Sequence, residues 1–219
     1  LEVNLDAVVH NFNHFRSKLH RDTKMVCMVK AFGYGAGSYE VAKTLQEHRC
    51  DYLAVAVADE GEALRKEGIS IPIIVMDPEF SSFNVLFERQ LEPEVYSFRL
   101  LDALMKEAGR RGITSYPIHI KIDTGMHRLG FRPSDVREIC QRLEQQSSLV
   151  VRSVFSHLVG SDSPEHDEFT RGQIRLFTQS AEALEAGLGY PVLKHILNSA
   201  GIERFTGHQM DMVRLGISL

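Results

Sequence analysis

Short apolar runs alternate with amphipathic stretches along the chain. Eight runs predict buried strands, at residues 25–30, 52–57, 71–76, 93–97, 118–123, 150–157, 192–198 and 212–217. The stretches between them space their apolar residues as helices do, at residues 38–48, 58–66, 81–89, 99–110, 133–145, 169–186 and 199–205, and a further helix is predicted at 5–19. Strands that alternate with helices indicate a parallel sheet with helical crossovers.

The number of repeats predicts the architecture. Eight strand–helix units in 219 residues favour a (β/α)₈ TIM barrel, an α/β fold, as one domain over residues 1–219. A doubly wound open sheet is the alternative. The glycines at positions 33, 35 and 37 lack the spacing of a dinucleotide-binding fingerprint, so that class of site is not expected.

The composition of the chain disfavours several classes of binding partner. A net charge of −4 provides no basic surface for nucleic acid or an anionic membrane. No apolar stretch has the length of about 20 residues that a membrane span requires. The three cysteines are odd in number, lack metal-type spacing and are typical of reduced thiols. We therefore expect a cytoplasmic protein that binds neither nucleic acid nor membrane, and no metal.

Lys30 stands at the expected end of the first strand, directly before the glycine-rich residues 31–37. Folds of this class bind ligands at the carboxyl ends of their strands. Desolvation disfavours the charged form of an amine there, which makes it a nucleophile or a base. Such a lysine forms a Schiff base with a carbonyl substrate or with pyridoxal phosphate. Position alone favours equally a lysine that merely extends to solvent.

The predicted fifth strand alternates strictly between apolar and polar residues. Three isoleucines share one face, and His119, Lys121 and Asp123 share the other. Buried charges persist only when they are paired, hydrogen-bonded or modified, so this face predicts a polar network. The loop that follows contains Arg128, a residue suited to binding a carboxylate or a phosphate.

The last three strands also end in polar residues. His157 ends the sixth predicted strand, and Arg214 lies within the eighth. Asn198 directly precedes a short predicted helix, and Ser199 is the first residue of that helix. Backbone N–H groups at a helix start bind anions, and the loops after strands seven and eight are the usual phosphate site of this barrel. A single functional site is indicated because polar residues recur at the same end of several strands: Lys30, Lys121, Arg128, His157 and Arg214.

Four of these segments resemble a known family. Residues 29–37 closely resemble the pyridoxal-phosphate lysine motif of alanine racemases, and residues 121–131 are similar to their second hallmark. Residues 198–200 and 212–217 match the third and fourth, and residues 1–19 are similar to the leading segment. The resemblance covers essentially the whole chain. The sequence as a whole is most similar to the racemase half of ligase–racemase fusion proteins of cell-wall synthesis.

The resemblance implies a fold-type III barrel that binds pyridoxal 5′-phosphate and interconverts L- and D-alanine for peptidoglycan synthesis, in a homodimer. Lys30 would form the Schiff base and exchange protons at the substrate Cα. Arg128 would contact the phenolic oxygen of the cofactor and the substrate carboxylate. Lys121 matches a lysine that is often carbamylated in the family, and the modification would turn its cation into an anion that braces Arg128. The family pattern also assigns cofactor contacts to Tyr34, His157, Asn198, Ser199, Arg214, Gly216 and Ile217.

Arg214 would face the pyridine nitrogen. A guanidinium cannot give up its proton, because its pKa exceeds ~12, so the ring stays a weaker electron sink. That favours reprotonation at Cα over transamination. The resemblance places a second catalytic base, a tyrosine, in a β-rich carboxyl-terminal domain beyond Leu219. We therefore expect these 219 residues to bind cofactor but to racemise poorly. His127 stands where the family pattern has a small residue.

Three other functions fit parts of the pattern. A non-catalytic pyridoxal-phosphate-binding barrel with a role in cofactor homeostasis is disfavoured by the motif at residues 123–131 and by Lys121. A fold-type III amino-acid decarboxylase is disfavoured by Arg214. A class I-type aldolase barrel would use the lysine without the cofactor.

Overall fold

The computed structural model describes residues 2–219. Leu1, the first residue of the predicted domain and leading segment, lies outside this part. Eight parallel strands pair in the order β7-β6-β5-β4-β3-β2-β1-β8. They are β1 (Lys24–Met28), β2 (Tyr52–Val55), β3 (Ile73–Val75), β4 (Glu92–Val95), β5 (Tyr116–Lys121), β6 (Leu149–Phe155), β7 (Leu193–His195) and β8 (Met212–Leu215). All eight predicted strands are confirmed, and most of them are shorter than predicted.

Every predicted helix is also present. The helices are α1 (Leu5–Ser17), α3 (Ser38–Glu47), α4 (Ala58–Lys66), α5 (Phe83–Glu88), α6 (Phe98–Arg110), α7 (Val136–Glu144), α8 (Asp167–Leu188) and α9 (Ser199–Arg204). The short α2 (Lys30–Tyr34) was not expected from the sequence. Parallel strands that alternate with helices confirm the (β/α)₈ fold class. No helix in the described part of the chain combines the length and the apolar character of a membrane span.

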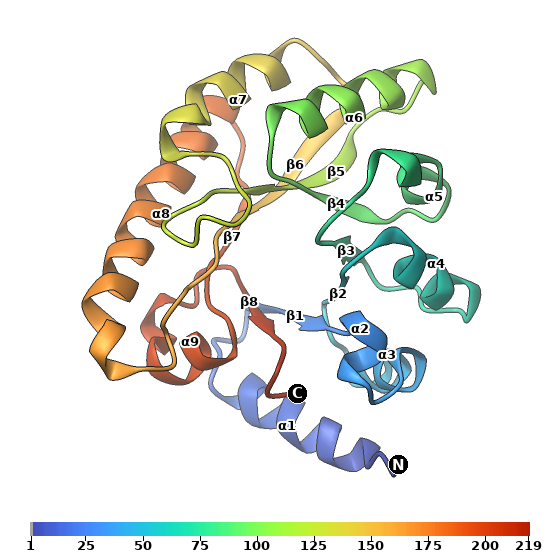
Figure 1. Ribbon diagram of the computed structural model, residues 1–219, viewed down its shortest axis with the longest axis vertical. Helices are drawn as coiled ribbons and strands as arrows, with labels where there is room; N and C mark the ends of the chain where they lie inside the picture. Colours follow the sequence, from blue (N-terminus) through green and yellow to red (C-terminus); the bar gives the residue numbers. More distant parts are fainter. Residues whose placement is uncertain (1) are drawn as a thin grey trace. The chain divides into compact units, whose positions relative to one another are not determined.

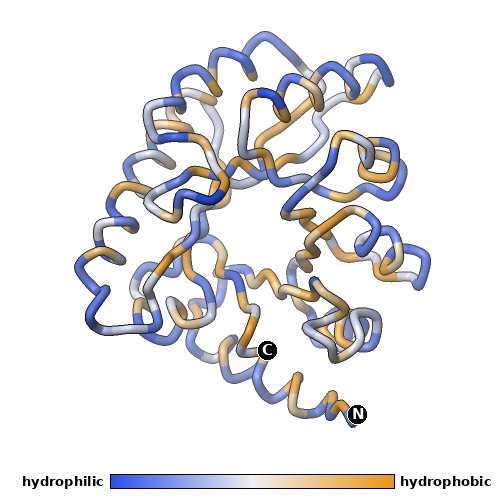
Figure 2. The backbone as a smooth tube through the Cα atoms, in the orientation of Figure 1, coloured by the Kyte–Doolittle hydropathy of each residue, from blue (hydrophilic) through white to orange (hydrophobic). Residues whose placement is uncertain are grey.

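The chain forms two compact units, and the first comprises residues 2–93 with 197–219. Its strand β1 pairs with β2 on one side and with β8 on the other, so that Val26 is the register partner of both Tyr52 and Arg214. Figure 1 shows the helices α2, α3 and α4 beside the strands β1 to β3. Apart from Lys24 at the start of β1, these strands are largely hydrophobic (Figure 2), as expected of parallel strands that are buried on both faces.

The second unit comprises residues 94–196. Strands β5 and β6 form its longest pairing, which contains a register shift between Ile118 and His119. The three isoleucines of the β5 region are fully buried, as their alternation predicts. The amphipathic helices α6, α7 and α8 belong to the same unit (Figure 1). The long α8 ends at Leu188 and is capped by Gly189, whose left-handed conformation (φ 76°) is typical of a helix stop.

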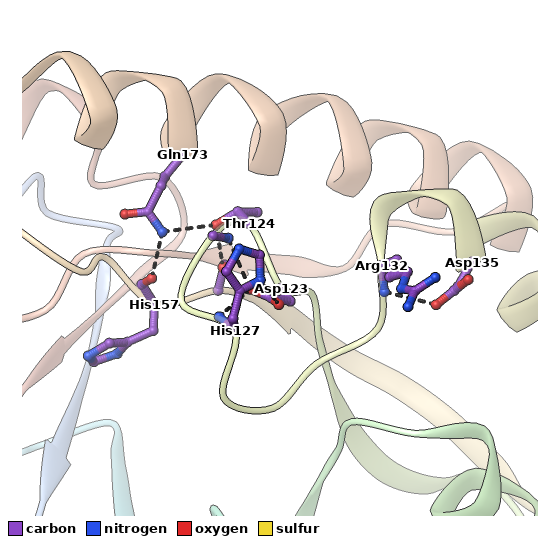
Figure 3. A network of polar contacts seen from close by, with 9 residues as sticks. Asp123, Thr124, His127, Arg132, Asp135, His157 and Gln173 are labelled. Carbon is purple, nitrogen blue, oxygen red and sulfur yellow. Dashed lines mark hydrogen bonds and ion pairs between the residues drawn. The ribbon is translucent and has the colours of Figure 1, made fainter.

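At two of the boundaries that differ, the kind of element is also wrong. The first strand was expected to end at Lys30, but β1 ends at Met28 and Lys30 begins α2, because the residues after it turn in the left-handed direction. The helix expected from Pro133 begins as a 3₁₀ turn, Pro133–Asp135, before α7. The Asp135 carboxylate accepts a hydrogen bond from the backbone N–H of Arg132 at 2.9 Å and fixes that turn (Figure 3).

Candidate functional site

Lys30 lies at the start of an unusual turn. The three residues after it, Ala31, Phe32 and Gly33, have φ of 52°, 55° and 62°, and Tyr34 has φ of 55°. Only Gly33 among these four is a glycine, the residue that adopts left-handed backbone without a steric penalty. The other three are L-residues, for which this conformation is unfavourable. Lys30 itself is half-buried. The lysine therefore stands next to stored backbone strain, which is typical of functional sites.

Side chains from two helices hold this turn. The Glu60 carboxylate, on α4, accepts hydrogen bonds from the backbone N–H of Ala31 at 2.8 Å and of Ala56 at 2.7 Å. The Ser38 hydroxyl, on α3, donates to the carbonyl oxygen of Val29 at 3.2 Å. These contacts flank Lys30 on both sides along the chain.

Three residues that the sequence assigned to phosphate binding come together in the first unit. The Ser199 hydroxyl oxygen accepts a hydrogen bond from the backbone N–H of Gly216 at 3.0 Å. A Cβ atom on Gly216 would lie only 3.1 Å from the hydroxyl oxygen of Tyr34. Partial burial raises the pKa of the Tyr34 phenol further above neutrality, where its ordinary pKa already keeps it a hydrogen-bond donor. The neighbouring Ile217 is 87% exposed.

The other two predicted residues of this unit are fixed by backbone contacts. Asn198 caps α9, since its side-chain oxygen accepts a hydrogen bond from the N–H of Gly201 at 2.9 Å. Arg214 is buried in β8, and its backbone N–H donates to the carbonyl oxygen of Leu197 at 2.9 Å. An arginine that is 4% exposed requires polar or anionic partners, as the sequence predicts.

In the second unit, Lys121 forms a buried ion pair. Its ammonium nitrogen lies 2.7 Å from a carboxylate oxygen of Glu94, and their side chains are 5% and 0% exposed. The same nitrogen lies 5.6 Å from the ring centroid of Phe155. The cation is thereby neutralised within the unit.

A second polar chain follows from His119. Its Nδ1 lies 2.6 Å from the Ser153 hydroxyl oxygen, which lies 2.9 Å from Nε2 of His195. All three residues are buried, and the His195 ring stacks on Phe155. The polar face of β5 thus forms the hydrogen-bonded network that its alternation predicts.

The loop after β5 is organised by Asp123 (Figure 3). One carboxylate oxygen accepts from the N–H groups of Gly125 at 2.9 Å and His127 at 3.1 Å, and the other lies 3.0 Å from the His127 ring. Partial burial alone would raise the pKa of Asp123, but these backbone and imidazole hydrogen bonds outweigh it and hold the pKa below its usual value. Asp123 therefore shapes the loop that bears Arg128.

Gln173 of α8 joins the ends of two strands (Figure 3). Its amide nitrogen donates to the carbonyl oxygen of His157 at 3.0 Å and to the Thr124 hydroxyl at 3.4 Å. The Thr124 hydroxyl in turn lies 2.7 Å from that of Ser156. The imidazole of His157 points away from this network, which leaves its ring to other contacts.

Arg128, a predicted site residue, and its neighbour His127 are both exposed in this unit. Arg128 is exposed and makes no polar contact with any other described residue. The His127 side chain is 83% exposed and contacts Asp123. The bulk that distinguishes His127 from the small residue of the family pattern is therefore accommodated at the surface of this unit.

Sequence reasoning missed the supporting side chains. Glu94 lies within the strand residues 92–95, and an acid inside a buried strand is a signal for a paired cation. Glu60, Ser38 and Gln173 hold backbone groups of distant segments, and such contacts leave no local pattern in the sequence.

Comparison with known proteins places the chain in a family. The model described as "Alanine racemase, N-terminal domain" matches residues 3–219. Alanine racemase 1 of Oceanobacillus iheyensis is 36% identical over 100% of this chain and 58% of that protein. Two structures of alanine racemase from Clostridium difficile 630, one in complex with cycloserine, have TM-scores of 0.92 at 32% and 33% identity, over 99% of this chain and 56% and 59% of theirs.

The chain thus spans little more than half the length of the relatives that it matches. The matching segment is continuous, and it contains both the Lys30 turn and the contact between Ser199 and Gly216. The chain therefore belongs to the alanine racemase N-terminal domain family.

Proposed function

We propose that this chain binds pyridoxal 5′-phosphate at Lys30 and forms the cofactor-binding part of an alanine racemase. The observation that supports this most directly is the cluster of Tyr34, Ser199 and Gly216, three residues that are distant in sequence and adjacent in the structure. Membership of the family and the half-buried lysine agree with it.

The residues present fit a phosphorylated cofactor. The space that a Cβ on Gly216 would fill lets an anion approach the backbone, which only glycine allows. The Ser199 hydroxyl uses its oxygen as an acceptor and keeps its own proton for donation. Tyr34 supplies a further O–H donor. In the proposal, Tyr34, Ser199 and the N–H group of Ile217 hold the phosphate, and the N–H of Gly216 would exchange its bond to the Ser199 hydroxyl for one to the phosphate. Asn198 maintains the start of α9.

Pyridoxal phosphate, when bound, supplies an electron sink that acidifies the Cα–H bond of an amino acid. Lys30 would hold the aldehyde carbon of the cofactor and move the proton at Cα. Arg214 would face the ring nitrogen as a donor that keeps its proton. The cofactor and substrate contacts expected of Arg128 and His157 belong to the same proposal. The bracing of Arg128 by a carbamate on Lys121 is left out of it, because the Lys121 cation already pairs with Glu94.

Alanine is the proposed substrate, because the relatives are named alanine racemases. Further parts of the proposal rest on the sequence resemblance: residues 1–219 as one domain, a homodimer, a cytoplasmic location, D-alanine supply for peptidoglycan, and fusion to a ligase. Size-exclusion chromatography of the protein, with light scattering, tests the homodimer.

Absorbance tests the central assignment. Pyridoxal phosphate added to the purified protein is expected to give a bound-cofactor band that Lys30→Ala lacks. Borohydride reduction followed by peptide mass spectrometry should locate the adduct on Lys30. Production of D-alanine from L-alanine, which is expected to be slow for these 219 residues, tests the reaction, and release of carbon dioxide would indicate a decarboxylase instead. A protein that shows no band at saturating cofactor contradicts the proposal.

A further inference from the structure

The left-handed turn after Lys30 requires support from outside itself. Ala31, Phe32 and Tyr34 are non-glycine residues with φ near 50° to 55°. Left-handed backbone costs roughly 1–2 kcal/mol for each such residue, and runs of them are rare. A conformation of this kind persists only when neighbouring groups fix it.

Glu60 is placed to fix this turn. One oxygen of its carboxylate accepts from the N–H of Ala31 at 2.8 Å, and the other accepts from the N–H of Ala56 at 2.7 Å. The first of these N–H groups belongs to the peptide unit that joins Lys30 to Ala31. Hydrogen bonds to an ionised acceptor are short and about twice as strong as neutral ones. One carboxylate thus ties the peptide next to the lysine to the segment that follows β2.

We propose that Glu60 is a positioning residue for Lys30, an inference that rests on the proposed cofactor binding. Glu60 orients the peptide unit from which the Lys30 side chain extends, and through the same turn it sets the position of Tyr34. Its two oxygens both accept from backbone N–H groups. A glutamine at this position could satisfy only one of them, because its amide nitrogen is a donor.

The matched control is Asp59. It precedes Glu60 on α4, is exposed, and makes no polar contact with the described part of the chain. Both residues lie in the first turn of α4, where an acidic side chain favours the helix. Asp59→Asn therefore removes the same charge and the same helix effect as Glu60→Gln, but leaves the turn after Lys30 in place.

The experiment compares the wild type with Glu60→Gln, Asp59→Asn and Lys30→Ala. Each is titrated with pyridoxal phosphate, and the absorbance of the saturated protein is recorded against pH. We expect Glu60→Gln to weaken cofactor binding by about tenfold, the loss of one charge-assisted hydrogen bond. We also expect an altered absorbance profile at saturation, which lower stability alone would not produce. Asp59→Asn is expected to match the wild type.

Glu60→Asp provides a second variant if Glu60→Gln fails to fold. It keeps the charge at the start of α4 but withdraws the oxygens by one methylene, so we expect weaker binding here too. If the wild type binds, Lys30→Ala does not, and both Glu60 variants bind as the wild type does, the positioning role is wrong and the proposed function stands. If the wild type itself does not bind the cofactor, the proposed function fails.

Discussion

The ammonium nitrogen of Lys121 lies 2.7 Å from the carboxylate of Glu94, and almost no solvent reaches either side chain. Two charges in such surroundings are costly unless each neutralises the other. Loss of one partner should therefore destabilise the fold more than replacement of both residues by apolar ones. This relationship leads to two predictions.

Removal of one partner should destabilise the protein strongly. Glu94→Gln leaves the Lys121 cation without its carboxylate, and we expect the free energy of unfolding to fall by about 3–5 kcal/mol. The double variant Glu94→Gln/Lys121→Met removes both charges and should recover much of that loss. Urea unfolding followed by circular dichroism measures each value. Equal losses in the single and double variants would contradict the idea that an uncompensated charge causes the effect.

Lys121 is expected to remain an unmodified amine. A carbamate would replace its cation with an anion next to the buried Glu94 carboxylate, and two like charges there are mutually destabilising. ¹³C NMR of the protein in ¹³C-bicarbonate should therefore show no lysine carbamate resonance. Glu94→Gln removes the repulsion, so a resonance that appears in this variant alone would support the argument. A carbamate signal in the wild type would overturn it and favour the modification that the family resemblance suggests.

Much of the fold could be predicted from the sequence, because each strand is an apolar run and each helix has its own periodicity. The end of β1 could not be predicted. The run of residues 25–29 continues smoothly into Lys30, and nothing local shows that Ala31 and Phe32 adopt left-handed backbone. The backbone N–H of Ala31 in this turn donates to the carboxylate of the distant Glu60, and a contact of that kind leaves no local pattern in the sequence.

Only part of the candidate site could be predicted from the sequence. Tyr34, Ser199 and Gly216 were found through the family motifs, and the structure brings them together. The polar face of β5 was found through its alternation, but the partners of that face were not. Glu94 and Ser153 lie on neighbouring strands, and the register between strands is not written in either strand alone.

The Asp123 loop should lose stability in acid. Because the folded pKa of Asp123 is lowered, its carboxylate contributes stability above the unfolded pKa, near 3.9, that is lost as pH falls through the folded value. Asp123→Asn should lower the free energy of unfolding by about 1–2 kcal/mol at pH 7. It should also show a smaller decline below about pH 4. Urea unfolding at several pH values measures both effects. His127→Ala keeps both backbone hydrogen bonds and should lose less; an equal loss would assign the effect to the imidazole.

The cysteines should differ in reactivity. Cys27 and Cys50 are buried, whereas Cys140 is half-buried. Burial, followed by the contact with Cys50, raises the pKa of the Cys27 thiol well above its usual value. We expect a disulfide reagent at pH 8 to label at most Cys140 in the folded protein and all three thiols in urea. The Cys140→Ser variant should be unreactive when folded. Rapid labelling of that variant would show that β1 opens readily.

The sign of the stability effect for Cys27 follows from the same shift. Its thiol stays neutral in the folded protein but ionises in the unfolded chain above about pH 8.5, so stability should fall as pH rises beyond that value. Cys27→Ala should flatten this decline in urea unfolding between pH 8 and pH 10.

A methyl group on Gly216 should separate packing from cofactor binding. In Gly216→Ala the new Cβ would lie 3.1 Å from the Tyr34 hydroxyl oxygen, and we expect a loss of about 1 kcal/mol in unfolding free energy. Tyr34→Phe removes that oxygen, so the double variant should regain the stability. It should still bind pyridoxal phosphate weakly, because the space for the anion stays filled and the proposed Tyr34 donor is lost as well. Gly207→Ala is the control, since no atom lies within 4 Å of its added Cβ. Wild-type cofactor affinity in Gly216→Ala would place the phosphate elsewhere in the molecule.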